Sequence, residues 1–431
     1  MLGLLKEAGY KIVAEEDAEI LVVNTCGFIQ AAKEEAIQTT LEAAQYKENG
    51  RCRLLIMAGC FSQRYISQLT AELPEVDFFM GLDDVPRIVQ ICRHLDQGHN
   101  PQSGNSRISE TLLRSTPSTY IYDHRAPRVN LGVKHSAYVK IAEGCRYHCS
   151  FCAIPMIRGA LRSRPMNSII QEAATLAEHG VKELILIAQD TTSYGVDLMG
   201  KSMIVPLLER LLAIEKIHWI RLMYAYPTNL DLSLMRLLAD SEKICSYLDL
   251  PLQHIDDTIL KAMRRAITEV KTRKLLERLR QEIPGLTLRT SFIVGFPGET
   301  ETAFNKLVEF VRDVQFDRVG VFTYSHEEGT LSYDMPGQIP REVAENRHQH
   351  LMKVQADISL KKHQTMLGTL KTVLVDGVSA ETPLLLEART EGQAPEIDGV
   401  VYINEGETHP GAFERVRITE AFPYDLVGKI I

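Results

Sequence analysis

Three of the eight cysteines lie within eight residues of one another, in the segment EGCRYHCSFCAIPMIRG. Cys145, Cys149 and Cys152 have the spacing C-x3-C-x2-C, directly after a strand-like apolar segment. At this spacing one loop can turn three thiolates toward a single cluster, and thiolates are the usual protein ligands of iron–sulfur clusters. Three ligands on a four-iron cube leave one iron open to the nitrogen and oxygen atoms of a small molecule. The pattern therefore indicates a redox cluster with an open coordination position.

Two other interpretations of these cysteines stay open. Zinc is bound tetrahedrally by cysteine and histidine, so His148 could complete a zinc site with the same three thiols. Alternatively, the three are unrelated thiols of the protein core. Eight cysteines in 431 residues are too few for a disulfide scaffold, and their clustering favours metal ligation in a reducing, cytosolic compartment.

The elements that must position the cysteines alternate between strands and helices. Between 136 and about 325, six strand candidates are separated by helices, which favours parallel strands in an open or partial (β/α) barrel with its chemistry at the carboxyl ends of the strands. The expected strands are 137–143, 183–188, 218–224, 246–251, 286–295 and 317–324. The expected helices include 166–179, 203–214, 230–240, 257–265 and 300–313, and a polar helix at 341–366 closes the region.

Two smaller regions flank this core. The first 97 residues predict a small α/β domain, with strands at 20–24 and 53–60, a helix at 29–46 and a further helix from about Gln63. The last 65 residues contain short strands separated by turns, which predict a small antiparallel barrel or sandwich. We therefore expect an amino-terminal domain (1–97), a linker rich in Pro, Ser, Gly and Asn (98–134), a core (135–366) and a terminal domain (367–431).

The composition excludes several classes of protein. The net charge of -8 does not suit a protein that coats nucleic acid through a general positive charge. No run of 18 consecutive apolar residues is present, which excludes a transmembrane helix. The first residues, MLGLLKEAGYKIVAEED, become charged too early for a signal peptide.

The motif C-x3-C-x-aromatic-C, in which Phe151 is the aromatic residue, resembles the radical S-adenosylmethionine superfamily. In that superfamily the open iron holds the amino and carboxylate groups of S-adenosylmethionine. One electron from the cluster then cleaves this cofactor to a 5'-deoxyadenosyl radical. The cofactor carries the chemistry, and the protein positions and shields it.

The chain is most similar to the methylthiotransferases of this superfamily, over nearly its whole length. ELILIAQDTTSYG, YAYPTNL, LDLPLQHIDDTILKAMRR and FIVGFPGET resemble family blocks, and the terminal domain resembles the TRAM module. NTCGFI and AGC resemble the segments that hold an auxiliary cluster, which makes Cys26 and Cys60 metal ligands beside Cys145, Cys149 and Cys152. The resemblance thus implies two [4Fe-4S] clusters and S-adenosylmethionine.

Within the family, AQDTTSYG, LQHI and YDLVGKI are most similar to the RimO type. That type methylthiolates the β-carbon of an aspartate in ribosomal protein S-twelve. From Lys371 to Ile431 five Lys or Arg stand against eleven Asp or Glu, a net charge of -6. This charge suits a basic ribosomal protein, or the small ribosomal subunit that contains it, better than the phosphates of tRNA. Methylthiolation of a tRNA adenosine and a zinc-stabilised binding module are the two alternatives.

The amino terminus departs from the family pattern. Family members begin with a strand and a cysteine in a Cys-Pro-Lys-Asn-like segment, whereas this chain starts in or after the following helix and supplies only Cys26 and Cys60 of three expected ligands. Cys52 lies at the opposite end of the strand that leads to Cys60, about 26 Å away, and cannot substitute. We therefore expect a truncated sequence whose core cluster still forms. Cys52, Cys92 and Cys245 are expected to be ordinary buried thiols.

Several residues outside the cysteine loop are candidates for contacts with the cofactor. Gln189 and Asp190 follow an expected strand and are expected to bond the ribose or the substrate; the alternative for Asp190 is helix capping. Gly295 and Gly298 would let the backbone approach the adenosine; the alternative is a tight turn. Glu143 and Arg158 flank the cysteine loop, and we expect Arg158 to pair with a carboxylate of the cofactor or substrate; the alternative is a surface ion pair.

A radical mechanism would explain why the core shows no clear general base, and no catalytic residue is assigned. An unactivated carbon–hydrogen bond needs a radical rather than a base. An external electron donor, a flavodoxin or ferredoxin, is implied. The protein is expected in the cytoplasm, with no membrane partner and no nucleic acid as its direct substrate.

Overall fold

The computed structural model describes residues 1–97 and 117–431. The first part of the expected linker, 98–116, lies outside the described residues. The chain divides into two compact units. Unit 1 contains 1–129, 143–162 and 325–333, and unit 2 contains 130–142, 163–324 and 334–431. Among the described residues, no helix combines the length and apolar character needed to cross a membrane.

Unit 1 is built on a three-stranded parallel sheet of order β1-β2-β3. The central strand is buried along its whole length because helices cover both of its faces. Its strands are β1 (Ile20–Thr25), β2 (Leu54–Gly59) and β3 (Phe78–Met80), and its helices are α1 (Leu2–Glu7), α2 (Gln30–Asn49), α3 (Cys60–Glu72), α4 (Ile88–Asp96), α6 (Ile154–Arg158) and the short η1 (Glu15–Asp17) and η2 (Leu82–Arg87). The short strand β3 was not predicted.

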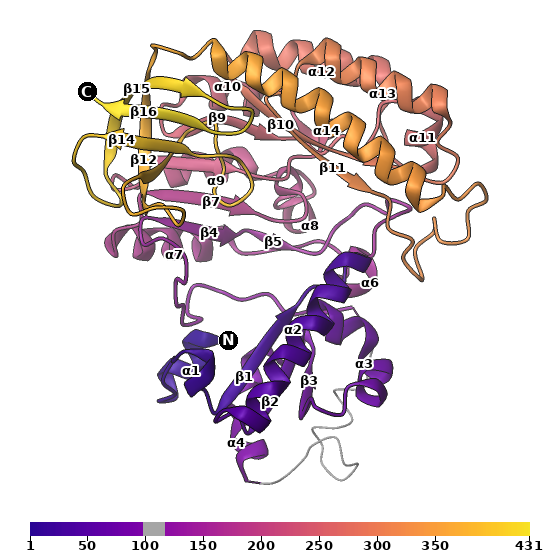
Figure 1. Ribbon diagram of the computed structural model, residues 1–431, viewed down its shortest axis with the longest axis vertical. Coiled ribbons are helices and arrows are strands. Elements are labelled where there is room, and N and C mark those ends of the chain that lie inside the picture. The colour runs from indigo at the N-terminus through magenta and orange to yellow at the C-terminus, as the bar shows by residue number, and fades with distance from the viewer. Residues whose placement is uncertain (98–116) are drawn as a thin grey trace. The chain divides into compact units, whose positions relative to one another are not determined.

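Unit 2 contains a six-stranded sheet of order β11-β10-β9-β8-β7-β4, in which every pair is parallel (Figure 1). This confirms the open (β/α) core. The strands are β4 (Ser136–Lys140), β7 (Glu183–Ile187), β8 (Trp219–Leu222), β9 (Ile244–Asp249), β10 (Thr287–Val294) and β11 (Arg318–Thr323). The short strands β5 (Ala142–Glu143) and β6 (Arg162–Ser163) lie beside the cysteine segment in the sequence.

The helices of unit 2 follow the expected alternation, with further helices outside the expected ranges. They are α7 (Met166–Glu178), η3 (Thr191–Ser193), α8 (Val196–Met199), α9 (Ile204–Leu212), η4 (Pro227–Asn229), α10 (Leu232–Asp240), α11 (Asp257–Ala262), α12 (Glu269–Glu282), α13 (Glu301–Val314) and α14 (Arg341–Gln364). We had not singled out α12, which begins at the capping residue Thr268. The ring of Phe292 packs on Phe310 of α13, so this side of β10 faces the helices. We call the opposite side of the sheet its inner face.

The terminal domain is a closed five-stranded barrel of order β12-β13-β14-β16-β15. Its strands are β12 (Leu370–Val378), β13 (Leu386–Thr390), β14 (Val401–Glu405), β15 (Phe413–Ala421) and β16 (Leu426–Ile430). A barrel was one of the two expected forms, but the expectation that it is wholly antiparallel was wrong. The pair β14–β16 is parallel, because the chain reverses direction between β14 and β15 and again between β15 and β16.

A buried group of charged side chains fixes the terminal barrel to the amino ends of the core strands. Arg389 on β13 donates to Glu183 on β7 (2.8 Å) and to Asp376 on β12 (2.6 Å). Arg221 on β8 also donates to Glu183, at 3.0 Å, and His135 contacts Asp376 at 3.0 Å. Glu183 and Arg221 are fully buried, so these charges are stable only when paired. Figure 1 shows the barrel beside the starting ends of β7 and β9.

Candidate functional site

The cysteine loop of unit 1 is a compact turn held by its own backbone. The amide of Cys145 donates to the carbonyl of Gly159 (3.2 Å), and that of Cys152 donates to the carbonyl of Cys149 (3.1 Å). Gly144 has a φ of 73°, and a Cβ atom there would lie 2.1 Å from the carbonyl oxygen of Ala160. Only glycine therefore fits where the loop begins. The three thiols and Phe151 are half-buried on this loop.

Cys26 and Cys60 come together because they follow neighbouring parallel strands. The register pairs Thr25 with Gly59, so each cysteine is the next residue at the carboxyl end of its strand. Adjacent strands lie about 4.8 Å apart, which places the two segments side by side. Cys26 is exposed and Cys60 is buried. The sequence-based assignment of both to one cluster is compatible with this placement, and it stays a prediction.

Arg158 links the cysteine loop to Cys60. Its guanidinium donates to the sulfur of Cys60 at 3.1 Å and pairs with Glu143 at 2.8 Å. Burial raises the pKa of the Cys60 thiol, and the neighbouring Arg158 opposes that shift. The expected partnership of Arg158 with a carboxylate is thus made within the protein. The carboxylate side chain of Glu143 is only 6% exposed, so this is not a surface ion pair.

A second charged contact in unit 1 fixes the segment that carries Cys26. Arg64 lies one helical turn after Cys60 and donates to the carbonyl of Gly27 (3.0 Å) and to Glu327 (2.7 Å). Lys33 pairs with the same carboxylate at 3.0 Å. Burial alone would raise the pKa of Glu327, but Ser325, Lys33 and Arg64 lower it. We did not predict this contact, because Glu327 is more than 260 residues away from Arg64 in the sequence.

The donor set of the loop fits an iron–sulfur cluster by its chemistry. Three thiols stand on one turn, and among the described residues no cysteine forms a disulfide. Among the described residues, no three His, Cys, Asp or Glu side chains stand close enough together to hold a single metal ion. The three thiols and His148 are no exception. A four-iron cube is several Å wide and takes one thiolate on each of its irons, so its ligands stand further apart than those of one ion.

In unit 2, Asp190 caps the short helix η3. Its carboxylate accepts hydrogen bonds from the amide and hydroxyl groups of Thr192 and Ser193 and from the side chain of Asn229. Asp190 is buried, and burial raises its pKa while these hydrogen bonds oppose the shift. The neighbouring Gln189 is half-buried. Contacts of either residue with ribose or substrate stay predictions, and the geometry gives Asp190 the capping role.

Gly295 and Gly298 form the turn that leads from β10 into α13. Their φ values are 74° and 81°, and a Cβ at Gly295 would lie 2.4 Å from the Cβ of Ala344. Glu299 fixes this turn from within: it accepts from the amide of Gly295, from Arg347 (2.7 Å) and from His254 (3.1 Å). The turn itself thus requires both glycines. A role in approaching adenosine stays a prediction.

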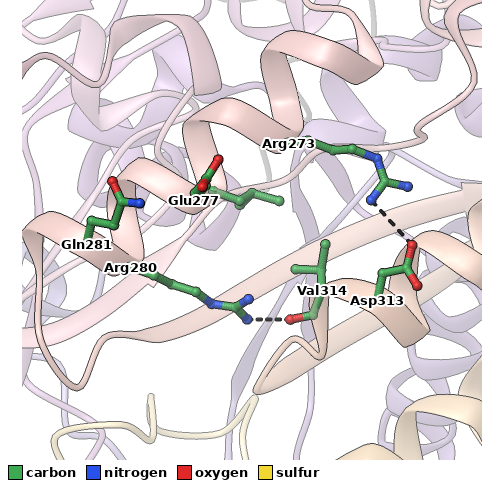
Figure 2. Close-up of a pocket in the computed structure, with 7 residues that line it drawn as sticks. Arg273, Glu277, Arg280, Gln281, Asp313 and Val314 are labelled. Atoms are coloured by element: carbon green, nitrogen blue, oxygen red, sulfur yellow. Dashed lines mark hydrogen bonds and ion pairs between the residues drawn. The ribbon is translucent and has the colours of Figure 1, made fainter.

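The described surface also has two hollows in unit 2, and neither lies at the carboxyl ends of the strands. One, of about 360 Å³, lies between α12 and α13 (Figure 2). Its two arginines contact other groups of the protein: Arg273 pairs with Asp313 at 3.4 Å, and Arg280 donates to the carbonyl of Val314. The other, of about 530 Å³, is lined by the starts of β10 and β11 and by the terminal barrel.

Comparison with known families assigns most of the chain. Residues 139–311 match the Radical SAM superfamily, residues 367–431 match the TRAM domain, and residues 1–81 match the uncharacterized protein family UPF0004. These matches confirm the expected fold class, an amino-terminal domain followed by a radical SAM core and a TRAM barrel.

Full-length relatives give a sharper match. The chain is 46% identical over 432 residues to the ribosomal protein uS12 methylthiotransferase RimO of Geotalea uraniireducens and 48% identical to that of Geobacter sulfurreducens. Each alignment covers 100% of this chain and 94% of the relative. Among solved structures, the radical S-adenosylmethionine methyltransferase TsrM from Kitasatospora setae has a TM-score of 0.54 at 13% identity, covering 83% of this chain and 69% of that one. This structural likeness supports the fold alone.

Proposed function

The chain belongs to the family of ribosomal protein uS12 methylthiotransferases, and on that premise we propose that it adds a methylthio group to the β-carbon of an aspartate in uS12. The observation that carries the proposal is the identity of 46% to 48% over the whole chain, with the three-cysteine loop in place. The charge of -6 on the terminal domain supports a basic protein substrate over tRNA.

The family uses [4Fe-4S] clusters and S-adenosylmethionine, and together these supply radical chemistry at a carbon that no base can activate. In this chain Cys145, Cys149 and Cys152 would hold the cluster that binds S-adenosylmethionine. Cys26 and Cys60 would hold the auxiliary cluster. Arg158 would keep the sulfur of Cys60 and the carboxylate of Glu143 in fixed positions beside the loop.

The partners follow from the same proposal. A flavodoxin or ferredoxin would supply the electrons. The protein would act in the cytoplasm, where its ribosomal substrate would be available. We also propose the domain limits expected from the sequence: 1–97, a linker over 98–134, a core over 135–366 and a terminal domain over 367–431.

The cluster assignment is tested by iron and labile sulfide per chain after anaerobic reconstitution, with zinc measured in the same sample. About four irons indicate one cubane cluster and about eight indicate two. Cys149→Ala should remove the iron of the loop, whereas Cys245→Ala should keep it, because Cys245 is a fully buried thiol whose pKa burial raises to about 12. Iron that is unchanged in Cys149→Ala, or zinc in place of iron, would contradict the assignment.

A further inference from the structure

The terminal barrel closes the inner face of the core sheet at its amino end. A buried apolar cluster joins the two: Ile185, Trp219, Cys245 and Tyr247 come from core strands, and Leu374, Ala394 and the partly buried Phe413 come from the terminal domain. The rings of Trp219 and Phe413 meet edge to face, with centroids 4.9 Å apart. The terminal domain therefore forms part of the wall that surrounds the inner face.

A series of polar contacts runs from this closed end toward the carboxyl ends of the strands. Asp398 of the terminal domain accepts from the hydroxyl of Tyr247 (2.8 Å) and lies 3.6 Å from the Nε atom of Arg289. Arg289 on β10 pairs with Asp249 on β9 at 2.9 Å. The other oxygen of Asp249 accepts from the backbone amide of Tyr224, at 3.3 Å.

Tyr224 has an unusual backbone. It follows β8 and has a φ of 57°, in the left-handed region, which costs a side-chain-bearing residue about 1–2 kcal/mol. Three hydrogen bonds hold it there: its amide donates to Asp249, and its carbonyl accepts from the amide (3.1 Å) and the hydroxyl (3.3 Å) of Thr191. Strain of this kind persists where the surroundings fix it, and it concentrates at functional sites.

The side chain of Tyr224 is partly exposed to solvent rather than buried. It is 39% exposed at the carboxyl end of its strand, the end at which cores of this architecture carry their chemistry. Phe322 on β11 is 49% exposed, and its ring lies 3.3 Å from where a Cβ of Gly320 would stand, on the side of the sheet that faces Arg289. Two exposed aromatic residues thus stand near the carboxyl ends of core strands.

We propose that Tyr224 contacts the substrate peptide and that Asp398 of the terminal domain is a positioning residue for it, acting through Arg289 and Asp249. This inference rests on the proposed function, because it takes the peptide around the modified aspartate as the ligand. The terminal domain then sets the geometry of the reactive end of the core from the opposite end of the sheet. Asp398 does not touch the substrate.

The contact chain explains why both carboxylates are needed. Asp249 is fully buried, and its position is fixed by Arg289. Arg289 stands between Asp249 and Asp398, so removing the charge of Asp398 lets the guanidinium shift toward Asp249 alone. The amide of Tyr224 then loses a fixed acceptor, which weakens one of the three hydrogen bonds that hold the left-handed conformation.

Asp398→Asn is the test, because asparagine keeps the size of the side chain and an acceptor for Tyr247. The left-handed backbone costs about 1–2 kcal/mol, so a weaker hold on it lowers its population by up to about 5- to 30-fold. We expect the KM for a uS12 peptide to rise by about that factor, with a smaller change in kcat. Glu420→Gln, an exposed carboxylate of the same domain, should leave KM unchanged. The fluorescence of Trp219, the only tryptophan, should be the same in both variants as in the parent, because the terminal barrel stays packed on the core.

Tyr224→Gly distinguishes an effect of Asp398 that passes through Tyr224, which we call the relay, from a general loss of structure. Glycine adopts a φ of 57° without strain, so in this background Asp398→Asn should have little further effect on KM. An unchanged KM in Asp398→Asn would overturn the proposal. So would additive effects of Asp398→Asn and Tyr224→Gly.

Hydrogen exchange keeps this test independent of the proposed activity. The amide of Tyr224 should exchange faster in Asp398→Asn than in the parent or in Glu420→Gln. If no uS12 peptide is modified by the parent protein, the proposed function fails. Faster exchange would then still show that Asp398 holds Tyr224, and unchanged exchange would overturn the relay as well.

Discussion

Replacing Arg389 by methionine measures how strongly the terminal barrel is bound to the core. The change removes the guanidinium that pairs with the carboxylates of both Glu183 and Asp376. Glu183 is fully buried and keeps Arg221, while Asp376 keeps His135. Breaking a buried ion pair by removing one partner costs about 3–5 kcal/mol, and because each carboxylate here keeps one other partner we expect the lower end, about 3 kcal/mol.

The assay is urea unfolding followed by the fluorescence of Trp219, whose ring packs on Phe413 of the barrel. With a slope of about 1–3 kcal/mol per molar urea, the midpoint should fall by at least about 1 M. Arg415→Met, an exposed arginine on β15, is the matched control and should change the midpoint little. Adding Glu183→Gln to Arg389→Met restores the charge balance and should recover part of the loss. Equal midpoints for Arg389→Met and Arg415→Met would refute this reasoning.

Three further predictions concern stability. Burial alone would raise the pKa of Glu183 and Asp376, but Arg389 and its neighbours hold both pKa values below the ordinary range. The stability that these two carboxylates contribute is therefore present above about pH 4 and is lost as the pH falls through the lowered pKa values. Asp376→Asn should accordingly flatten the fall of the urea midpoint in acid. Gly298→Ala should lower the free energy of unfolding by about 1–2 kcal/mol because of its positive φ alone. Gly295→Ala should lower the melting temperature further, because its Cβ would also stand 2.4 Å from the Cβ of Ala344. Equal melting temperatures for the two variants would contradict this. Arg158→Gln should lower the melting temperature more than Arg146→Gln, an exposed arginine of the same loop, because it leaves the buried Glu143 without its guanidinium; the reverse order in calorimetry would rule this out.

Local sequence patterns predicted the elements well, because each strand of the core is a short apolar run between turn residues. Their ends were less predictable. The strand expected at 218–224 stops at Leu222, since Tyr224 turns into the left-handed region under contacts with Asp249 and Thr191. The parallel pair in the terminal barrel was likewise missed, because pairing depends on the order of strands in space and not on any one strand.

The candidate site was predictable where chemistry and spacing coincide on one segment, as in the loop of Cys145, Cys149 and Cys152. It was not predictable where partners are distant in sequence. Glu183 and Arg389 are 206 residues apart, and Cys60 and Arg158 are 98 apart. Asp190 shows the opposite case: the Thr and Ser that follow it are a local capping signal, and the capping alternative describes its contacts.

The most direct test of the proposed function is the mass of uS12 after incubation with the reconstituted protein, S-adenosylmethionine and a reductant. We expect uS12 to gain one methylthio group, located by peptide fragmentation on the β-carbon of a single aspartate, and Cys149→Ala to abolish that gain. Unmodified uS12, with a methylthio group found instead on a tRNA adenosine in a parallel incubation, would contradict the proposal.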